Sequence, residues 1–131
     1  MTSIPADTAS AETIATFQHR VEHWVDACFG PELANDLPER NHRFLEEALE
    51  LVQSLGCTRD EVLALVEYVY GRAAGEPQQE VGGVMVTLAT LCTASGMDMQ
   101  REAETELHRI DHPVMIANIQ AKHARKPKLS A

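Results

Sequence analysis

Aromatic residues are scarce in this sequence, at 5% of the chain, so a core must be built mainly from leucine, valine, alanine and methionine. No apolar run approaches the ~18 residues that a membrane-spanning helix needs. The first residues also lack the basic region and apolar stretch of a secretory signal. We therefore expect a cytoplasmic protein with no membrane partner.

Cysteines are few and widely spaced, and Cys28, Cys57 and Cys92 form no C-x-x-C pair. Their odd number and wide spacing argue against a disulfide scaffold or a structural zinc site, and they fit a reducing cytoplasm. Cys57 has no neighbouring base that would activate it as a nucleophile. The sequence also lacks a glycine-rich phosphate loop and a Ser-His-Asp pattern.

Basic side chains are outnumbered, since 11 lysines and arginines face 20 aspartates and glutamates, for a formal net charge of −9. Four of the basic residues fall within residues 121–131, which leaves −13 on the other 120 residues. Such an acidic body repels nucleic acid, and we expect no nucleic-acid partner. It can still bind a polyanionic small molecule if carboxylates hold a divalent cation that phosphates share. The basic segment is either a solvated end or a phosphate contact.

Helical periodicity is the strongest signal that the chain does contain. In residues 12–29 the apolar side chains recur at intervals of three and four, and Gly30-Pro31 ends the pattern. Residues 81–87 could suit a strand, because they include β-branched residues, but the helical spacing continues past Leu91. A loop is expected over 31–37, and further helices over about 38–55, 58–72, 77–96, 98–110 and 113–126.

Start signals support these helices, because Thr58 and Glu61 form a capping-box pattern and Asp98 is a suitable cap. Short connections favour antiparallel neighbours. We therefore predict an all-α fold, a bundle of about six helices with a four-helix core. Wide apolar faces on a short chain leave surface to bury against a copy, which predicts a homo-oligomer. The domain is expected over 12–125, between a frayed tail at 1–11 and a basic tail at 126–131.

Three carboxylates interrupt the apolar face of the helix expected over 38–55, namely Glu46, Glu47 and Glu50. At ~100° per residue, Glu47 and Glu50 lie about 60° apart on one face, and Glu46 and Glu50 about 40° apart. Like charges at this spacing repel each other unless a cation is present. The cluster therefore predicts either a site for a hard cation or a solvated acidic stripe.

A further acid, Glu80, stands near the start of a later helix and is followed by Gly82 and Gly83. Two glycines inside a helix cost about 1 kcal/mol each relative to alanine. They are useful where another helix or a ligand approaches the backbone closely. Glu80 itself is either a ligand or an ordinary acidic residue at a helix N-terminus.

The pattern Glu46-Glu47-x-x-Glu50, with Glu80 thirty residues after Glu50, resembles the MazG-like all-α nucleoside triphosphate pyrophosphohydrolase superfamily. That family carries Glu-Glu-x-x-Glu on one helix and Glu-x-x-Asp on another. The similarity runs from about residue 40 to 99 and includes Arg40-x-x-Arg43 and Gly96-Met97-Asp98. It implies a dimeric or tetrameric helical bundle that binds Mg²⁺, with Mn²⁺ as an alternative. Such a protein splits the α–β phosphate bond of a nucleotide and releases pyrophosphate.

By the resemblance, Glu47, Glu50 and Glu80 are metal ligands, and Glu46 binds a second metal or orients the attacking water. The fourth position of the family pattern is Gly83, where aspartate is expected, so one carboxylate is missing. The outer phosphates could be held by Arg40, Arg43, Lys122 and Lys126. Arg43 could equally form an ion pair with Glu47 four residues later.

Other readings stay open. Gly83 leaves room for a catalytically impaired bundle that binds nucleotides or a protein, and a purely structural oligomer is a third possibility. Within the resemblance, a phosphoribosyl-ATP pyrophosphatase is a sibling with the same chemistry. His19 and His23 have a spacing that can bind a transition metal but lack an evident third ligand. Trp24 could stack on a base, or lie in a core or an oligomer interface.

Overall fold

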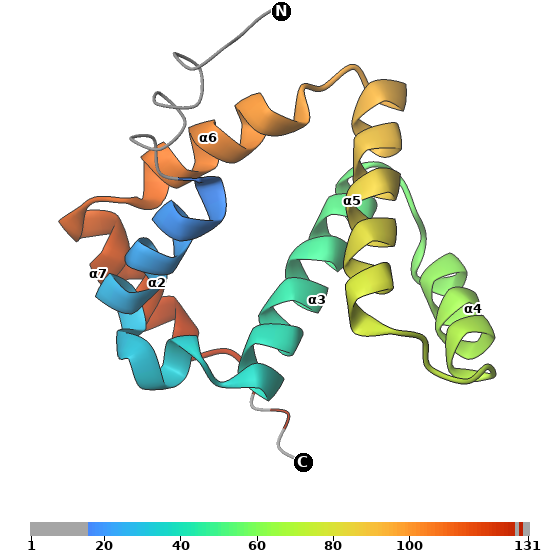
Figure 1. The fold of residues 1–131 in the computed structure, drawn as a ribbon, viewed down its shortest axis with the longest axis horizontal. Helices are drawn as coiled ribbons and strands as arrows, with labels where there is room; N and C mark the ends of the chain where they lie inside the picture. Colours follow the sequence, from blue (N-terminus) through green and yellow to red (C-terminus); the bar gives the residue numbers. More distant parts are fainter. Residues whose placement is uncertain (1–15, 128, 130–131) are drawn as a thin grey trace, which may run out of the picture. The chain divides into compact units, whose positions relative to one another are not determined.

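The structure, a computed structural model, describes residues 16–127 and residue 129 (Figure 1). This part of the chain is helical and contains no strand, as predicted, and residues 81–87 lie within a helix. Its six helices are α2 (Phe17–Ala34), α3 (Leu37–Ser54), α4 (Arg59–Tyr70), α5 (Pro77–Ala94), α6 (Met99–Ile110) and α7 (Pro113–His123). The tail expected over 1–11 and the first helical residues expected from Glu12 lie outside the described residues.

The helices begin where the sequence signals place them. Thr58 Oγ1 accepts a hydrogen bond from Glu61 N (3.2 Å), and Glu61 Oε1 accepts one from Thr58 N (2.8 Å), so the predicted capping box before α4 is confirmed. Hydrogen bonds that Thr58 N and Thr58 Oγ1 donate to the Glu61 carboxylate lower the pKa of Glu61. At α6, Asp98 Oδ1 accepts from Arg101 N at 2.8 Å. A proline opens both α5 and α7, as expected.

The loop expected over 31–37 is shorter in the structure. The chain kinks at Gly30, whose φ of 80° is accessible to glycine without steric cost. Pro31 then starts another helical turn that runs to Ala34, because its fixed φ suits a first helical position. Asn35 closes this turn by donating from Nδ2 to the carbonyl of Pro31 (2.8 Å). The Gly-Pro pair therefore bends α2 and does not end it.

The chain divides into two compact units. The terminal unit comprises the described residues up to Asp36 together with those from Ala103 onward, and it contains α2, α7 and most of α6. The central unit is Leu37–Glu102 and contains α3, α4 and α5. All the acids of the predicted metal site belong to the central unit.

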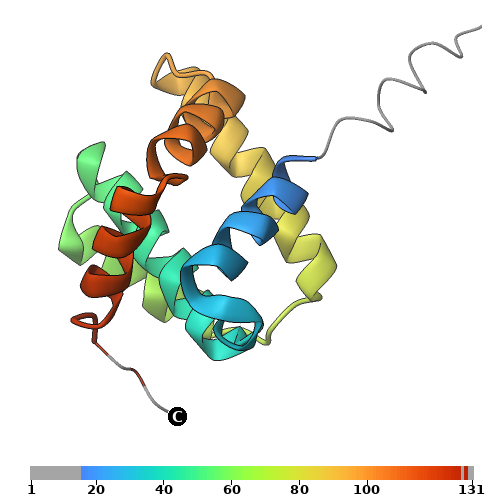
Figure 2. The ribbon, with the colours of Figure 1, turned by 90° about the vertical axis from the view of Figure 1, so that its left-hand side faces the viewer.

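In the terminal unit, α2 and α7 are the helices that pack most closely on each other (Figures 1 and 2). Gln120 on α7 donates from Nε2 to the carbonyl of Cys28 on α2 at 2.6 Å. One residue further along α2, the ring of Phe29 lies 4.9 Å from the ring of His123, centroid to centroid. Both contacts join the later halves of the two helices, so α2 and α7 run in the same direction.

Two polar contacts join α2 to α6. Trp24 Nε1 donates to the carbonyl of Ile110 at 3.1 Å, so this half-buried indole has a structural role. One turn earlier, both terminal nitrogens of Arg20 donate to the carboxylate of Glu104, with Nη1 lying 2.8 Å from Oε1. The hydrogen bonds from Arg20 lower the pKa of Glu104, and the same contact raises the pKa of Arg20.

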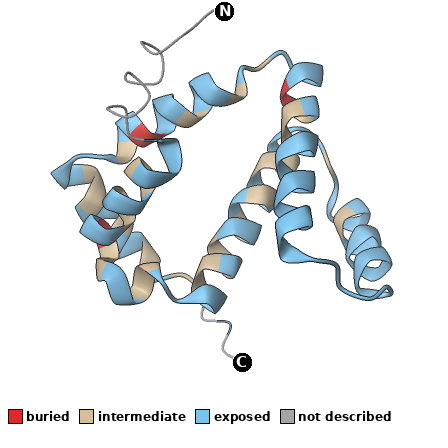
Figure 3. Cartoon of the chain, in the orientation of Figure 1, coloured by how far each residue is buried: buried red, intermediate tan, exposed pale blue. Residues whose placement is uncertain are grey.

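Very little of the described chain is buried (Figure 3). Fully buried apolar side chains are confined, among these residues, to Cys28, Cys92 and Leu107. Large apolar side chains stay exposed mainly on the helices of the central unit, including Phe44, Leu45, Leu49, Leu63, Leu65, Val66, Tyr68, Tyr70, Val81, Met85 and Val86. Among the described helices, none is by itself both long and apolar enough to cross a bilayer, and α5 with α6 meets that criterion only as a bent pair.

We predict that Arg20→Met raises the pKa of the Glu104 carboxyl toward that of an ordinary glutamate, because it removes the donors that favour the ionised form. Carbon-detected NMR titration of the Glu104 carboxyl in both proteins measures this shift. Since the pKa of Glu104 is lowered on folding, the stability that the pair contributes is present at neutral pH. It is lost as the pH falls through the lowered pKa.

The Arg59→Met variant, which alters an exposed arginine of α4 in the central unit, is the matched control and should leave the Glu104 titration unchanged. An Arg20→Met protein in which Glu104 titrates as in the wild type would contradict the assignment.

Candidate metal and phosphate site

The acids of the predicted site begin on α3, which is one unbroken helix. Its regular geometry puts Glu46, Glu47 and Glu50 on adjoining faces within one turn of each other, as the sequence predicts. Glu46 is half-buried, whereas Glu47 and Glu50 are exposed. Two of the three carboxylates therefore reach solvent, where a hydrated ion could meet them.

Arg43 binds two carboxylates of its own helix. Its Nε lies 3.1 Å from Oε2 of Glu39, and its Nη1 donates to Oε1 of Glu46 at 2.8 Å. The Arg43 side chain is only 17% exposed, and Glu39 and Glu46 are 20% and 33% exposed. Of the two roles considered for Arg43, the structure shows ion pairing within α3, with Glu39 and Glu46 as the partners. The guanidinium fixes the position of Glu46.

Glu80 lies in the first turn of α5, and its side chain folds back over the connection that precedes the helix. A Cβ built on Gly75 would overlap Oε2 of Glu80 and lie 3.2 Å from its Cδ. Any larger residue at position 75 would therefore move this carboxylate. The glycine before α5 thus leaves the space that the Glu80 carboxylate occupies.

Gly82 and Gly83 do not serve close packing between helices of the described chain, which was one of their two expected uses. A Cβ built on either residue meets no described atom within 4 Å. Both positions are exposed on α5. The two glycines therefore remain compatible with the other expected use, which is to leave space for a ligand or for another copy of the chain.

The predicted ligands do not already form a chelate. Among the described residues, no three histidine, cysteine, aspartate or glutamate side chains lie close enough to hold one ion. Glu47, Glu50 and Glu80 do belong to one compact unit, and their donors are all carboxylate oxygens. Mg²⁺ favours a few carboxylates completed by water and substrate oxygens, so the donor chemistry fits this ion. The ligand assignment stays a prediction.

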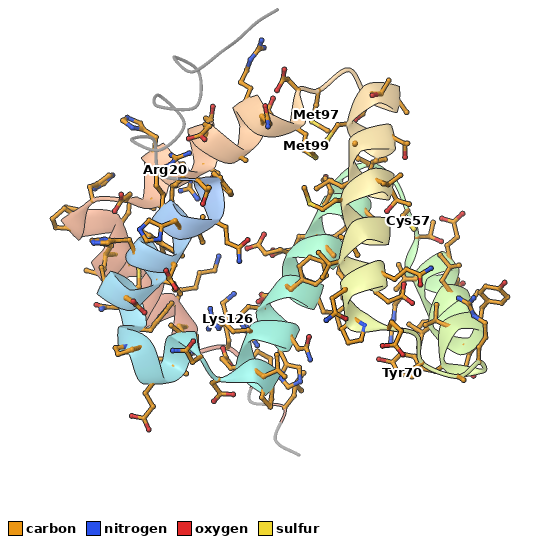
Figure 4. The ribbon with its side chains drawn as sticks, in the orientation of Figure 1. Arg20, Cys57, Tyr70, Met97, Met99 and Lys126 are labelled. Atoms are coloured by element: carbon orange, nitrogen blue, oxygen red, sulfur yellow. The ribbon has the colours of Figure 1, made fainter. Side chains whose placement is uncertain are left out.

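The four candidate phosphate contacts belong to different units. Arg40 and Arg43 lie on α3 in the central unit. Lys122 lies in the last turn of α7, and Lys126 follows the end of that helix, both in the terminal unit (Figure 4). Arg40 Nη2 lies 3.7 Å from Oε2 of Glu39, so it shares a carboxylate with Arg43.

A cavity of about 330 Å³ lies between α3 and α4 and is lined mainly by apolar side chains, among them Leu49, Val62 and Leu63. None of the predicted acids lines it. Cys57 lies at its edge, with Sγ 3.9 Å from the carbonyl of Thr58 (Figure 4). The Cys57 thiol also hydrogen-bonds to the carboxylate of Glu61, which adds to the lowering of the Glu61 pKa.

The three cysteines are free thiols in the structure. Cys28 is the most buried of them. Burial raises the pKa of its thiol, and the charge of Asp111 raises it further. This cysteine is therefore an inert part of the interior.

Sequence reasoning missed a second cavity, of about 650 Å³, in the terminal unit. Four histidines line it together with Trp24, namely His19, His23, His108 and His112. The first two were recognised by their spacing, but no third ligand was evident. A second pair of histidines at the same spacing, His108 and His112, was the available signal.

No protein-family model, curated protein or solved structure matches this chain. The resemblance to the MazG-like superfamily therefore rests on the quoted motif alone.

Proposed function

We propose that this protein is a Mg²⁺-dependent nucleoside triphosphate pyrophosphohydrolase, which hydrolyses the α–β phosphate bond to a nucleoside monophosphate and pyrophosphate. The observation that carries the proposal is α3, where Glu47 and Glu50 are exposed one turn apart while Arg43 holds the neighbouring Glu46. Carboxylates that repel each other on one face gain from a shared cation. Glu80 from the same compact unit supplies the further ligand.

The protein side chains have distinct parts in this reaction. Glu47, Glu50 and Glu80 would hold the ion, which would neutralise the phosphates and make a bound water more acidic. Glu46 accepts a proton from the attacking water while the water oxygen bonds to the α-phosphorus and the bridging oxygen leaves with pyrophosphate. Arg43 is a positioning residue, because it acts on the substrate through Glu46. Positioning and electrostatics supply most of the catalysis in such displacements.

Gly83 favours a second candidate, a bundle that binds nucleotides with little or no turnover. The family pattern expects a carboxylate three residues after Glu80, and this chain offers none there. Water can replace a carboxylate on Mg²⁺, so binding survives the loss. The ion then depends more strongly on nucleotide phosphates to complete its coordination.

A second copy of the chain is the proposed partner of the central unit. Large apolar side chains there are at least 40% exposed in many places, and on α4 Leu65 reaches 59%, Tyr68 63% and Tyr70 85% (Figure 4). Exposed apolar side chains occur on all three helices α3, α4 and α5 of this compact unit, and such surfaces commonly mark interaction sites.

We predict that the wild-type protein releases pyrophosphate from at least one nucleoside triphosphate, and that Glu47→Gln abolishes this release. The amide keeps the shape of the side chain but loses the charge that binds the ion. A panel of nucleotides with Mg²⁺ or Mn²⁺, assayed separately for pyrophosphate and orthophosphate, measures the reaction. Glu67→Gln, an exposed acid on α4, is the matched control and should keep wild-type turnover. Full activity in Glu47→Gln would refute the ligand assignment.

The Gly83→Asp variant should strengthen Mg²⁺ binding without nucleotide by roughly tenfold, because it adds a carboxylate on the face of Glu80. The side chain has room, since a Cβ there meets no described atom within 4 Å. Isothermal titration measures the affinity. Gly82→Asp adds the same charge about 100° away on an equally open position, so it should have little effect. Equal effects of the two variants would mean that residue 83 does not face the ion.

The oligomer is tested by light scattering coupled to gel filtration at micromolar concentration. We expect a mass of two or four times the 14.5 kDa chain. Leu65→Glu should lower that mass, because it places a charge in the exposed apolar surface of α4. Thr105→Glu on the exposed side of α6 is the control. A wild-type protein that stays monomeric would rule out the second copy as the partner.

A further inference from the structure

The cavity of about 650 Å³ in the terminal unit gathers four of the six histidines of the chain. His19 and His23 reach it from α2, His108 from α6, and His112 from the residue before α7. The predicted Mg²⁺ ligands belong to the central unit and do not line this cavity. Its chemistry is therefore separate from that of the proposed hydrolase site.

Imidazole nitrogens are the ligands that zinc, copper and nickel ions favour, whereas Mg²⁺ and Ca²⁺ favour oxygen. His19 and His23 lie one turn apart on α2, about 40° around the helix and ~6 Å along it. Two histidines at this spacing on one helix face can bind a single zinc ion. Both side chains are exposed, so their rings can turn toward an ion at low cost.

A carboxylate already stands behind one of these rings. Oε1 of Glu22 lies 3.5 Å from Nδ1 of His19. Histidines that bind metals through one ring nitrogen commonly donate from the other to a carboxylate, which fixes the tautomer and the orientation of the ring. At His19 this arrangement leaves Nε2 as the metal ligand.

Further ligands come from the opposite side of the cavity, where His108 and His112 are exposed. The described side chains do not yet share a point at which three of them could hold one ion. A rotation of His108 or His112 must therefore close the site. Arg20 and Glu104, which also line the cavity, already join α2 to α6 and keep the two sides of the cavity together (Figure 4).

We propose that this cavity is a transition-metal site for Zn²⁺ or Ni²⁺, with His19 and His23 as the first ligands and His108 or His112 as the ligand from across the cavity. A bound ion would tie α2 to the α6–α7 junction. An ion that binds the folded chain and not the unfolded chain raises the stability of the folded state. The site does not depend on nucleotide or on Mg²⁺.

The test is isothermal titration of the full chain without a histidine tag, using Zn²⁺ or Ni²⁺ in the presence of excess Mg²⁺. We expect one ion per chain, bound in the micromolar range, and a higher thermal unfolding midpoint in the loaded protein. The double variant His19→Ala/His23→Ala should bind at least roughly tenfold more weakly. His42→Ala, which alters a histidine of α3 in the central unit, is the control and should bind like the wild type.

A second measurement uses the wild-type protein, so it does not depend on the folding of a variant. Electron paramagnetic resonance of the Cu²⁺-loaded chain counts the coordinating nitrogens, and we expect at least three. A count of only two coordinating nitrogens would overturn the assignment of His108 or His112 as the third ligand. The absence of stoichiometric binding, or unchanged affinity in the folded double variant, would overturn the site itself.

Discussion

Each helix of the central unit has an apolar face that the described part of the chain does not bury. Isolated helices of 12 to 18 residues, the lengths of α3, α4 and α5, are marginal in water, and packing of the apolar face normally supplies most of their stability. Cys92 is the buried member of this unit among the described residues. These unburied apolar side chains are the reason for proposing a second copy of the chain as partner. The same lack of burial leaves the sites on these helices open to solvent.

Exposure to solvent determines how the carboxylates on α3 interact with one another and with an ion. Exposed carboxylates such as Glu47 and Glu50 interact in water, where mutual repulsion is weak and a hydrated ion can approach. The half-buried Glu46 is different, because Arg43 compensates its charge at 2.8 Å. The cost of burying Arg43 is in turn offset by Glu39, so three charged side chains stabilise one another along a single helix.

The two proposed metal sites differ in the hardness of their ligands. Carboxylate oxygens on α3 and α5 suit Mg²⁺, and the imidazoles beside α2 and α6 suit zinc-like ions. Mg²⁺ therefore competes poorly for the histidines. Within the terminal unit, hydrogen bonds and an ion pair connect α2 to α6 and α7. An ion among its histidines would add to connections that exist without it.

The helices and their first residues could be predicted from the sequence, because interactions between near neighbours in the chain determine them. Thr58 with Glu61 and Asp98 act through neighbours within three residues, so their caps needed no knowledge of the fold. Spacing along one helix likewise fixed the relation among Glu46, Glu47 and Glu50. The bend at Gly30 was signalled but misread as an end, because Pro31 suits a first helical turn as well as a stop.

Tertiary structure alone decided the contacts between segments distant in sequence. The pairing of Arg20 with Glu104 and of Trp24 with Ile110 joins residues more than 80 positions apart, which no local pattern encodes. The same separation in sequence concealed the histidine cavity, since His108 and His19 line one cavity only after α6 packs beside α2. Which side chains share a helix face could be read from their spacing in the sequence, because every turn of a helix has the same geometry. Only packing decided which faces meet, because that depends on how distant segments bury their surfaces together.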